Sequence, residues 1–550
     1  MKDSFRQSMS WLHTWSGLVF GWLLCAIFLT GTLSVFREPI TRWMEARPLL
    51  LVDADAGTRV SADALATATA VSQAVRHLSE QAADARFWRI ELPRREGDAM
   101  QMFWRKSGTA QGNEQAAMHP VTGSLLPQPW GRATEGGRHF MSFHYMLHLP
   151  EFGYWVVGAV SMCMLVALVS GVVVHRRIFQ DFFTFRPGKG QRSWLDAHNA
   201  TAVLTLPFLF MIVYTGLAIF YTTYMPWPLQ AAYGSGDKAS SRYQAELAHD
   251  GTAPLRRPRL GTPGVLHDLP PLLQQAQALL GVPVHTVIVE QPGDRNMTLR
   301  MIVRVTGLEA SRHIINPGGS VAFDGVSGKV LQVQLPTPAS TFASEQVHEA
   351  MEALHLVRFG GWSMKWLYFL SGLLGTVMMA TGIIMFSVKR RRKSMNEFGA
   401  ATAGMYRVVE WLNVTAVAGI CVACIGYFYL NRLLPADMPG RITWEIRGFL
   451  LVWLITLLHA MARPPARAWV EQLWTAAALC LCLPLLNGLT TGQHVGRYLM
   501  ASDWPRAGLE ITVMLIGLAL AWAAHRTRRG WRTSAMAKMP QRHARAEVQA

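Results

Sequence analysis

Six histidines stand near the ends of long apolar segments, where a polar ring is costly and needs a partner. They form two groups, one at each end of these segments: His13, His175 and His198, and then His144, His148 and His355. Neutral imidazole is a standard axial ligand of haem iron, and a low-spin iron takes two such ligands. Ligands of this kind come from facing helices at a common depth. The pattern therefore predicts two haem sites, one for each group.

The segments that carry these histidines are long enough to cross a membrane. Half of the 550 residues are apolar and only 16% are charged, which is unusual for a soluble chain of this size. A helix needs about 20 apolar residues to span the bilayer core. Eight stretches are predicted to do so, although the sixth and eighth are only marginally long: 14–36, 152–174, 199–236, 366–388, 411–431, 448–462, 473–493 and 511–525.

The net charge of +17 does not indicate a nucleic-acid-binding protein, because the positive residues gather in every second loop between these segments. The basic stretches lie around residues 2–6, 176–192, 389–407, 463–467 and 526–532. Under the positive-inside rule these stretches face the cytoplasm. The sequence therefore predicts a multi-pass protein of the lipid bilayer with both termini in the cytoplasm. Two long loops, at roughly 40–145 and 225–360, are predicted to lie on the other side.

The first four spans are predicted to be a duplication. His13 precedes Gly31 by 18 residues, and His198 precedes Gly216 by the same interval. The second and fourth spans begin alike, with Leu-His-Leu-x-x-Phe-Gly at 147–153 and again at 354–360, and they end in Ser-Gly at 170–171 and Thr-Gly at 381–382. A repeated unit therefore carries the histidines.

Each outer loop is predicted to fold as one helix plus a small antiparallel sheet. The first loop has a helix-like stretch at 62–77 and alternating segments near 87–91 and 100–104. The second loop has the corresponding stretches at 272–280, 284–290 and 297–305. In both loops a Thr-Gly or Ser-Gly turn precedes the last strand. The fifth to eighth spans lack such loops and are predicted to form an appended bundle.

Taken together, these motifs resemble the PepSY-associated transmembrane family. The resemblance covers about residues 1–395, and it is carried by Leu-His-x-Trp-x-Gly-Leu at 12–18, Phe-His-Tyr-x-Leu-His at 143–148, His-Arg-Arg-Ile-Phe-x-Asp-Phe-Phe-Thr-Phe-Arg at 175–186, Asp-x-His-Asn at 196–199 and Leu-His-x-x-x-Phe-Gly-Gly at 354–361. The outer loops are similar to PepSY modules. Some members of the family are bacterial ferric-siderophore reductases with two b-type haems. The resemblance thus implies a haem-dependent ferric reductase of the bacterial inner membrane, with about two haem b groups and periplasmic long loops.

The expected fold class is mainly α. It combines a duplicated four-helix transmembrane core, two α+β PepSY-like periplasmic domains and an appended four-helix bundle. The expected domains are the first span at 1–39, the first periplasmic domain at 40–145, the second and third spans at 146–225, the second periplasmic domain at 226–347, the fourth span at 348–395 and the appended bundle with its basic tail at 396–550.

Two symmetric ligand pairs are expected within the repeat. A two-fold axis along the membrane normal pairs His13 with His198 and His148 with His355, so that each pair binds one haem on the axis. The alternative is that interfacial histidines reach for water among aromatic neighbours. That alternative explains a single histidine well, but it explains less well four that occupy repeat-equivalent positions.

Two histidines break the repeat. Met351 and Phe386 fall near the counterparts of His144 and His175. Three roles stay open for these two histidines: replacing a symmetric ligand, hydrogen-bonding a haem propionate, or relaying protons.

Arginines near each histidine group are candidate propionate partners. We call His13, His175 and His198 the inner group, and His144, His148 and His355 the outer group. The arginines near the inner group in the sequence are Arg176, Arg177 and Arg192, and those near the outer group are Arg138 and Arg358. The alternative is that the first three only set the topology and that the other two only solvate the surface.

The expected activity is stepwise one-electron transfer from an unidentified cytoplasmic or membrane donor to a periplasmic ferric siderophore. Two alternatives stay open, namely a non-enzymatic PepSY-type binding or regulatory protein and a metal or small-solute permease. A zinc protease is not indicated, because the stretch from His144 to His148 has Tyr145 where the general base is required.

Overall fold

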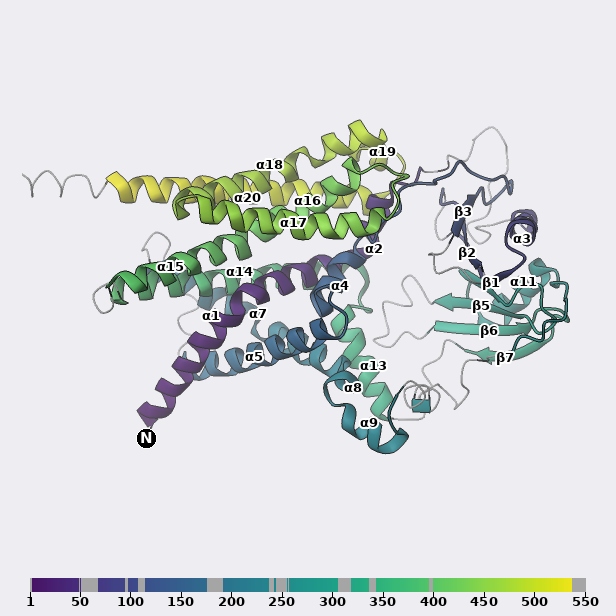
Figure 1. Ribbon diagram of the computed structural model, residues 1–550, viewed down its shortest axis with the longest axis horizontal. Coiled ribbons are helices and arrows are strands. Elements are labelled where there is room, and N and C mark those ends of the chain that lie inside the picture. The colour runs from purple at the N-terminus through teal and green to yellow at the C-terminus, as the bar shows by residue number, and fades with distance from the viewer. Residues whose placement is uncertain are drawn as a thin grey trace, which may run out of the picture. The chain divides into compact units, whose positions relative to one another are not determined.

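The structure is a computed structural model (Figure 1), which describes residues 2–48, 50, 68–93, 97–106, 114–175, 191–236, 242–243, 255, 257–304, 318–335, 343–394 and 399–536. The chain forms two compact units. The first, here called the membrane unit, contains Met1–Ala46, Arg132–Leu217 and Lys365–Ala550. The second, here called the sheet unit, contains Arg47–Gly131 and Ala218–Met364.

Eight helices among the described residues are long and apolar enough to cross a membrane, in agreement with the sequence analysis. These spans are Ser4–Ser34, Phe152–Val174, Ser193–Ile219, Gly361–Ser387, Gly404–Leu433, Arg441–Ala462, Pro465–Thr491 and Trp504–Trp531. The sixth and eighth are longer than their charge-free windows suggested. The reason is that these helices continue through charged residues that the protein buries, such as Arg441 and Glu510.

The membrane unit is entirely helical where it is described. Its helices are α1 (Lys2–Ser34), α2 (Arg37–Glu45), α4 (Arg138–Met146), α5 (Phe152–Val174), α7 (Gln191–Ile219), α14 (Gly361–Ser394), α15 (Gly399–Val414), a π-helical turn (Thr415–Gly419), α16 (Ile420–Leu433), α17 (Arg441–Ala462), α18 (Pro465–Thr491), α19 (Val495–Met500) and α20 (Trp504–Met536). The last residues of α7 and the first of α14 belong to the sheet unit.

Two apolar cores hold the membrane unit together. One joins the four spans of the expected duplication, α1, α5, α7 and α14, through residues such as Leu24, Val160 and Leu209. The other joins α1, α2 and α4 to the helices from α16 to α20 through residues such as Phe140 and Tyr427. The appended bundle therefore shares a core with the first part of the chain and is not a separate domain.

The sheet unit contains α3 (Ala68–Gln81), β1 (Ala85–Glu91), β2 (Met100–Lys106), β3 (Glu114–Met118), α8 (Tyr221–Tyr224), α9 (Pro226–Tyr233), α11 (Leu269–Leu280), β4 (Thr286–Glu290), β5 (Thr298–Arg304), β6 (Gly318–Asp324), β7 (Val330–Gln334) and α13 (Ala343–Leu356). The helix expected at 62–77 is described from Ala68 onward and ends later, at Gln81. After the Thr-Gly turn of the first loop, the expected last strand is reduced to a single bridge between Met118 and Leu125.

The two loops form one sheet, whereas the sequence analysis expected two separate domains. The strand order is β3-β2-β1-β4-β5-β6-β7, and β1 pairs with β4 in an antiparallel register (Figure 1). Residues of α3 and α11 share a single buried core with these strands, including Leu78 and Leu272. The physical reason is that β1 and β4 would otherwise be exposed edges with unpaired backbone groups.

The register of β1 and β4 predicts a specific cross-link. Leu92 N donates to His285 O, so hydrogen-bonded pairs alternate with non-hydrogen-bonded ones, and Arg89 lies opposite Ile288 in a non-hydrogen-bonded pair. The Cα atoms of such a pair are about 4.5 Å apart, which a disulfide spans. We expect an Arg89→Cys/Ile288→Cys variant to form an intramolecular disulfide on oxidation, detected by mass spectrometry of non-reduced peptides. The matched control is Arg89→Cys/Gln332→Cys, because Gln332 lies in the same row of the sheet but on β7, four strands away. Equal cross-linking of both pairs would contradict a single sheet.

Candidate functional site

His13 and His198, on α1 and α7, are held in the same way. Nδ1 of His13 lies 2.8 Å from Ala167 O, and Nδ1 of His198 lies 2.8 Å from Met378 O. A carbonyl oxygen only accepts hydrogen bonds, so Nδ1 carries the proton in both rings and donates it. Each Nε2 therefore keeps its lone pair, as in histidines that ligate a metal while the other ring nitrogen is bound to a carbonyl.

A glycine makes room for each ring. Gly171 follows Ala167 by one helical turn, and a Cβ atom there would lie 3.0 Å from His13 Cε1. Gly382 follows Met378 at the same interval, and a Cβ atom there would lie 3.1 Å from His198 Cε1. A larger residue at either position would push the ring away from the carbonyl.

A hydroxyl residue stands directly before each of these glycines. Ser170 Oγ donates to Val166 O at 2.6 Å and reaches Ala167 O at 3.2 Å, while Thr381 Oγ1 lies 2.8 Å from Met378 O. The Ser-Gly and Thr-Gly pairs that marked the repeat in the sequence are therefore the places where imidazole rings dock.

His144 on α4 is a third ring of this kind. Its Nδ1 lies 2.7 Å from Ile27 O, one turn before Gly31, where a Cβ atom would come within 2.5 Å of the ring. Thr30 precedes that glycine, and its Oγ1 lies 3.0 Å from Ile27 O. Burial lowers the pKa of His144, and the bond to Ile27 O only partly offsets this effect. The lowered pKa favours the neutral ring, in which Nε2 keeps its lone pair.

The inner group gathers around one cavity of about 540 Å³ in the membrane unit. His13, His175 and His198 line it, so the structure brings together all three inner histidines predicted from the sequence. The ring centres of His13 and His198 are 6.3 Å apart, and those of His13 and His175 are 6.4 Å apart.

The residues around this cavity fit a haem. The ring centres of His13 and His198 are near enough for both imidazoles to ligate one iron, and the pair of His13 and His175 has nearly the same spacing. Gly17 also lines the cavity, and a Cβ atom there would meet nothing within 4 Å. The lining combines such small residues with apolar ones, among them Leu206 and Met379, as expected for a buried cofactor.

In the outer group, His148 bonds to a further histidine, His139. His148 adopts a left-handed backbone conformation with φ of 54° after α4, and its Nε2 lies 2.9 Å from Nδ1 of His139. These two rings stack at 4.9 Å. His355 lies on α13 in the sheet unit, so its pairing with His148 stays a prediction.

His139 was missed by the sequence analysis. It is fully buried, and its Nε2 has no hydrogen-bond partner among the described residues. Burial, and in addition His148, lower its pKa well below the usual range. The available signal was its position on the same short helix as His144, five residues earlier in the chain.

Two of the candidate propionate partners are described with their side chains, and both form ion pairs. Arg138 is exposed and pairs with Glu135 at 3.2 Å, and Arg358 pairs with Glu352 at 2.8 Å. Arg176, Arg177 and the side chain of Arg192 lie outside the described residues.

The eight spans and the histidine-lined cavity define a multi-pass membrane protein with an internal site. The family model of the PepSY-associated TM region matches residues 10–389, which is more than half of the chain. The protein therefore belongs to the PepSY-associated transmembrane family, as its motifs predicted. No curated protein matches the sequence. The match ends before α15, so the appended bundle lies outside the family region.

Alanine substitutions at two glycines should have opposite effects on the stability of the protein. Gly31→Ala places a methyl group within 2.5 Å of His144, and we expect a stability loss of about 1–3 kcal/mol from overpacking. Gly508→Ala on α20 meets open space outside the cavity lining, and the helix propensity of alanine favours it by about 1 kcal/mol. Thermal unfolding of the two variants in detergent measures the difference. An equal effect of both substitutions would show that Gly31 has no special docking role.

Proposed function

We propose that the protein is a haem-dependent oxidoreductase of the bacterial inner membrane, which passes electrons across the bilayer to a periplasmic ferric siderophore and so releases its iron. The observation that carries the proposal is the shared presentation of His13 and His198. Both rings donate Nδ1–H to a backbone carbonyl, both line one cavity, and their spacing suits two ligands of one iron.

The protein's own residues supply the conditions that such a site needs. The carbonyls of Ala167 and Met378 fix the tautomer and the orientation of the two ligand rings. The glycines beside the rings make room for the imidazoles, and apolar residues contribute much of the cavity lining. Haem, when bound, supplies a one-electron carrier whose potential depends on its ligands and its burial.

The outer side of the membrane unit supports a second haem through His144. This ring has the same kind of carbonyl partner and the same kind of adjacent glycine as His13 and His198. Nε2 of His148 is instead engaged with His139. On the membrane unit we therefore favour His144 as the outer ligand, which is the replacement of a symmetric ligand that the broken repeat left open.

The acceptor side follows from charge and chemistry. The basic loops assign the sheet unit to the periplasmic side under the positive-inside rule. The family resemblance supports a ferric siderophore as the acceptor. Reduction by one electron converts ferric to ferrous iron, for which the hard oxygen ligands of a siderophore are a poorer match. The iron is released as a consequence.

The proposal predicts two separable haems. The purified protein should contain about two low-spin b-type haems. His13→Ala or His198→Ala should remove about half of the haem, because each removes one of the two inner ligands while the outer site stays intact. Dithionite-reduced difference spectra and a pyridine haemochrome assay measure both quantities.

The matched control is His459→Ala on α17, whose ring bonds to Glu471 and not to the cavity. This variant should keep both haems. Haem-free protein from haem-replete cells would overturn the proposal and favour a binding protein or a permease.

The side of the acceptor is tested with sealed membranes. Ferric siderophore that cannot cross the bilayer should reoxidise dithionite-reduced protein in spheroplasts, where the periplasmic face is accessible. It should act far more slowly on inverted vesicles, since the sheet unit is then enclosed. The iron-free siderophore is the control and should leave the reduced spectrum unchanged in both. A stable reduced spectrum with several ferric complexes would contradict a siderophore acceptor.

A further inference from the structure

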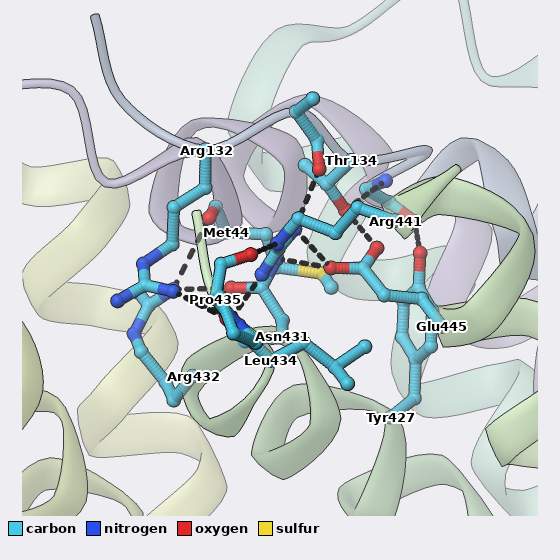
Figure 2. Close-up of polar contacts among 12 residues, drawn as sticks. Met44, Arg132, Thr134, Tyr427, Asn431, Arg432, Leu434, Pro435, Arg441 and Glu445 are labelled. Atoms are coloured by element: carbon cyan, nitrogen blue, oxygen red, sulfur yellow. Dashed lines mark hydrogen bonds and ion pairs between the residues drawn. The ribbon is translucent and has the colours of Figure 1, made fainter. Parts of the chain in front are cut away.

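Charged side chains are buried in the spans of the appended bundle. Arg432 and Arg441 are each 2% exposed, and Glu445 is fully buried. Ionisable residues inside membrane helices are costly and mark functional positions by default. Figure 2 shows these side chains in one cluster with Arg132, Thr134, Tyr427 and Asn431.

Arg432 ties the bundle to α2. Its guanidinium donates to Trp43 O at 2.6 Å and to Met44 O at 3.1 Å, which are carbonyls in the last turn of α2. The same group lies 3.7 Å from the centre of the Trp43 ring. One buried cation thus caps a helix that belongs to the family region.

Arg441 and Glu445 hold the segment that leads into α4. Arg441 donates to Ala133 O at 2.5 Å and forms an ion pair with Glu445. Thr134 Oγ1 donates to Glu445 Oε2 at 2.6 Å and accepts a bond from Gly136 N at 3.0 Å. These contacts are drawn in Figure 2.

The start of α4 is also held against α2. Gly137 N donates to Thr41 Oγ1 at 3.0 Å, and a Cβ atom at Gly137 would lie 2.4 Å from the backbone of Arg37. Tyr427 OH donates to Gly136 O at 3.2 Å. Residues 132–137 therefore have little freedom, because α2 and α16 hold them in place.

α4 then presents the outer histidines. His139 stacks on the Tyr427 ring at 4.2 Å and meets the edge of Phe449 at 4.5 Å. His144 follows on the same helix and docks on α1. We propose that the appended bundle positions the histidines of α4, which are His139 and His144. In this proposal Arg441, Glu445 and Thr134 are positioning residues for the outer haem site. The inference rests on the proposed function, because it treats the outer histidines as a haem site.

The inner site does not depend on this cluster. His13 and His198 are held by carbonyls of α5 and α14, within the duplicated spans. The appended bundle should therefore affect one haem and not the other, which separates positioning from general stability.

The test uses the full-length protein in detergent. Thr134→Val keeps the shape of the side chain but loses the hydroxyl that joins Glu445 to Gly136, while Thr134→Ser keeps it. We expect Thr134→Val and Glu445→Gln to shift the midpoint potential and the electron paramagnetic resonance signal of the outer haem, or to lose that haem. The inner haem should be unchanged, and Thr134→Ser should behave as the wild type.

Hydrogen exchange gives a second measurement. Peptides covering 132–148 should exchange amide hydrogens faster in Thr134→Val and Glu445→Gln, while peptides covering 191–219 should not.

The matched control is Glu471→Gln, which removes a carboxylate of the same bundle that pairs with His459 and Arg463 instead of the α4 segment. It should change neither haem.

Unchanged outer haem and unchanged exchange of 132–148 in Thr134→Val would overturn the inference while leaving the proposed function intact. Haem-free wild-type protein would overturn the proposed function, and the exchange of 132–148 would then decide the positioning role alone. If Glu445→Gln fails to fold, the milder Thr134 pair decides.

Discussion

Inside a bilayer every polar group has to find its partner within the protein, and the hydrogen bond from an imidazole to a helix carbonyl is the interaction on which this structure depends. Ordinary helix carbonyls are shielded by the side chains one turn further on. The Ser-Gly and Thr-Gly steps solve this problem, because glycine uncovers the carbonyl one turn before it. Ala167 O, Met378 O and Ile27 O therefore accept a ring that would otherwise be an unsatisfied polar group.

In the sheet unit, backbone polar groups find their hydrogen-bond partners through strand pairing. Each loop alone provides a short sheet whose inner strand, β1 or β4, would be left with a free edge. Pairing these two strands satisfies both edges with one ladder and lets α3 and α11 cover a common core. Each of the two loops thus supplies the strand that completes the other.

Much of this organisation was predictable from the sequence, because it depends on patterns along the chain. Hydropathy located all eight spans, and the spacing of His13 and His198 identified the inner pair that lines the cavity with His175. The union of the two loops in one sheet was not predictable, since strand pairing between distant segments leaves no local signal. His139 was missed because no motif marks it, and its one signal was a place on the same short helix as His144. The dependence of α4 on Glu445 joins residues more than 300 positions apart, which composition and periodicity do not report.

The two ends of the membrane unit are therefore built on different principles. The inner cavity is lined by His13 and His198, whose rings have equivalent surroundings. At the outer end the repeat is broken, because Met351 stands where His144 has its counterpart. α4 packs against the appended bundle. α13, which carries Met351 and His355, belongs to the sheet unit. A histidine on a helix that is held in place keeps one ring orientation. His144 lies on such a helix, and its ring is also bound to Ile27 O. The bundle lies outside the family region and holds the start of α4 in place, so the support of this end of the membrane unit comes from residues beyond that region.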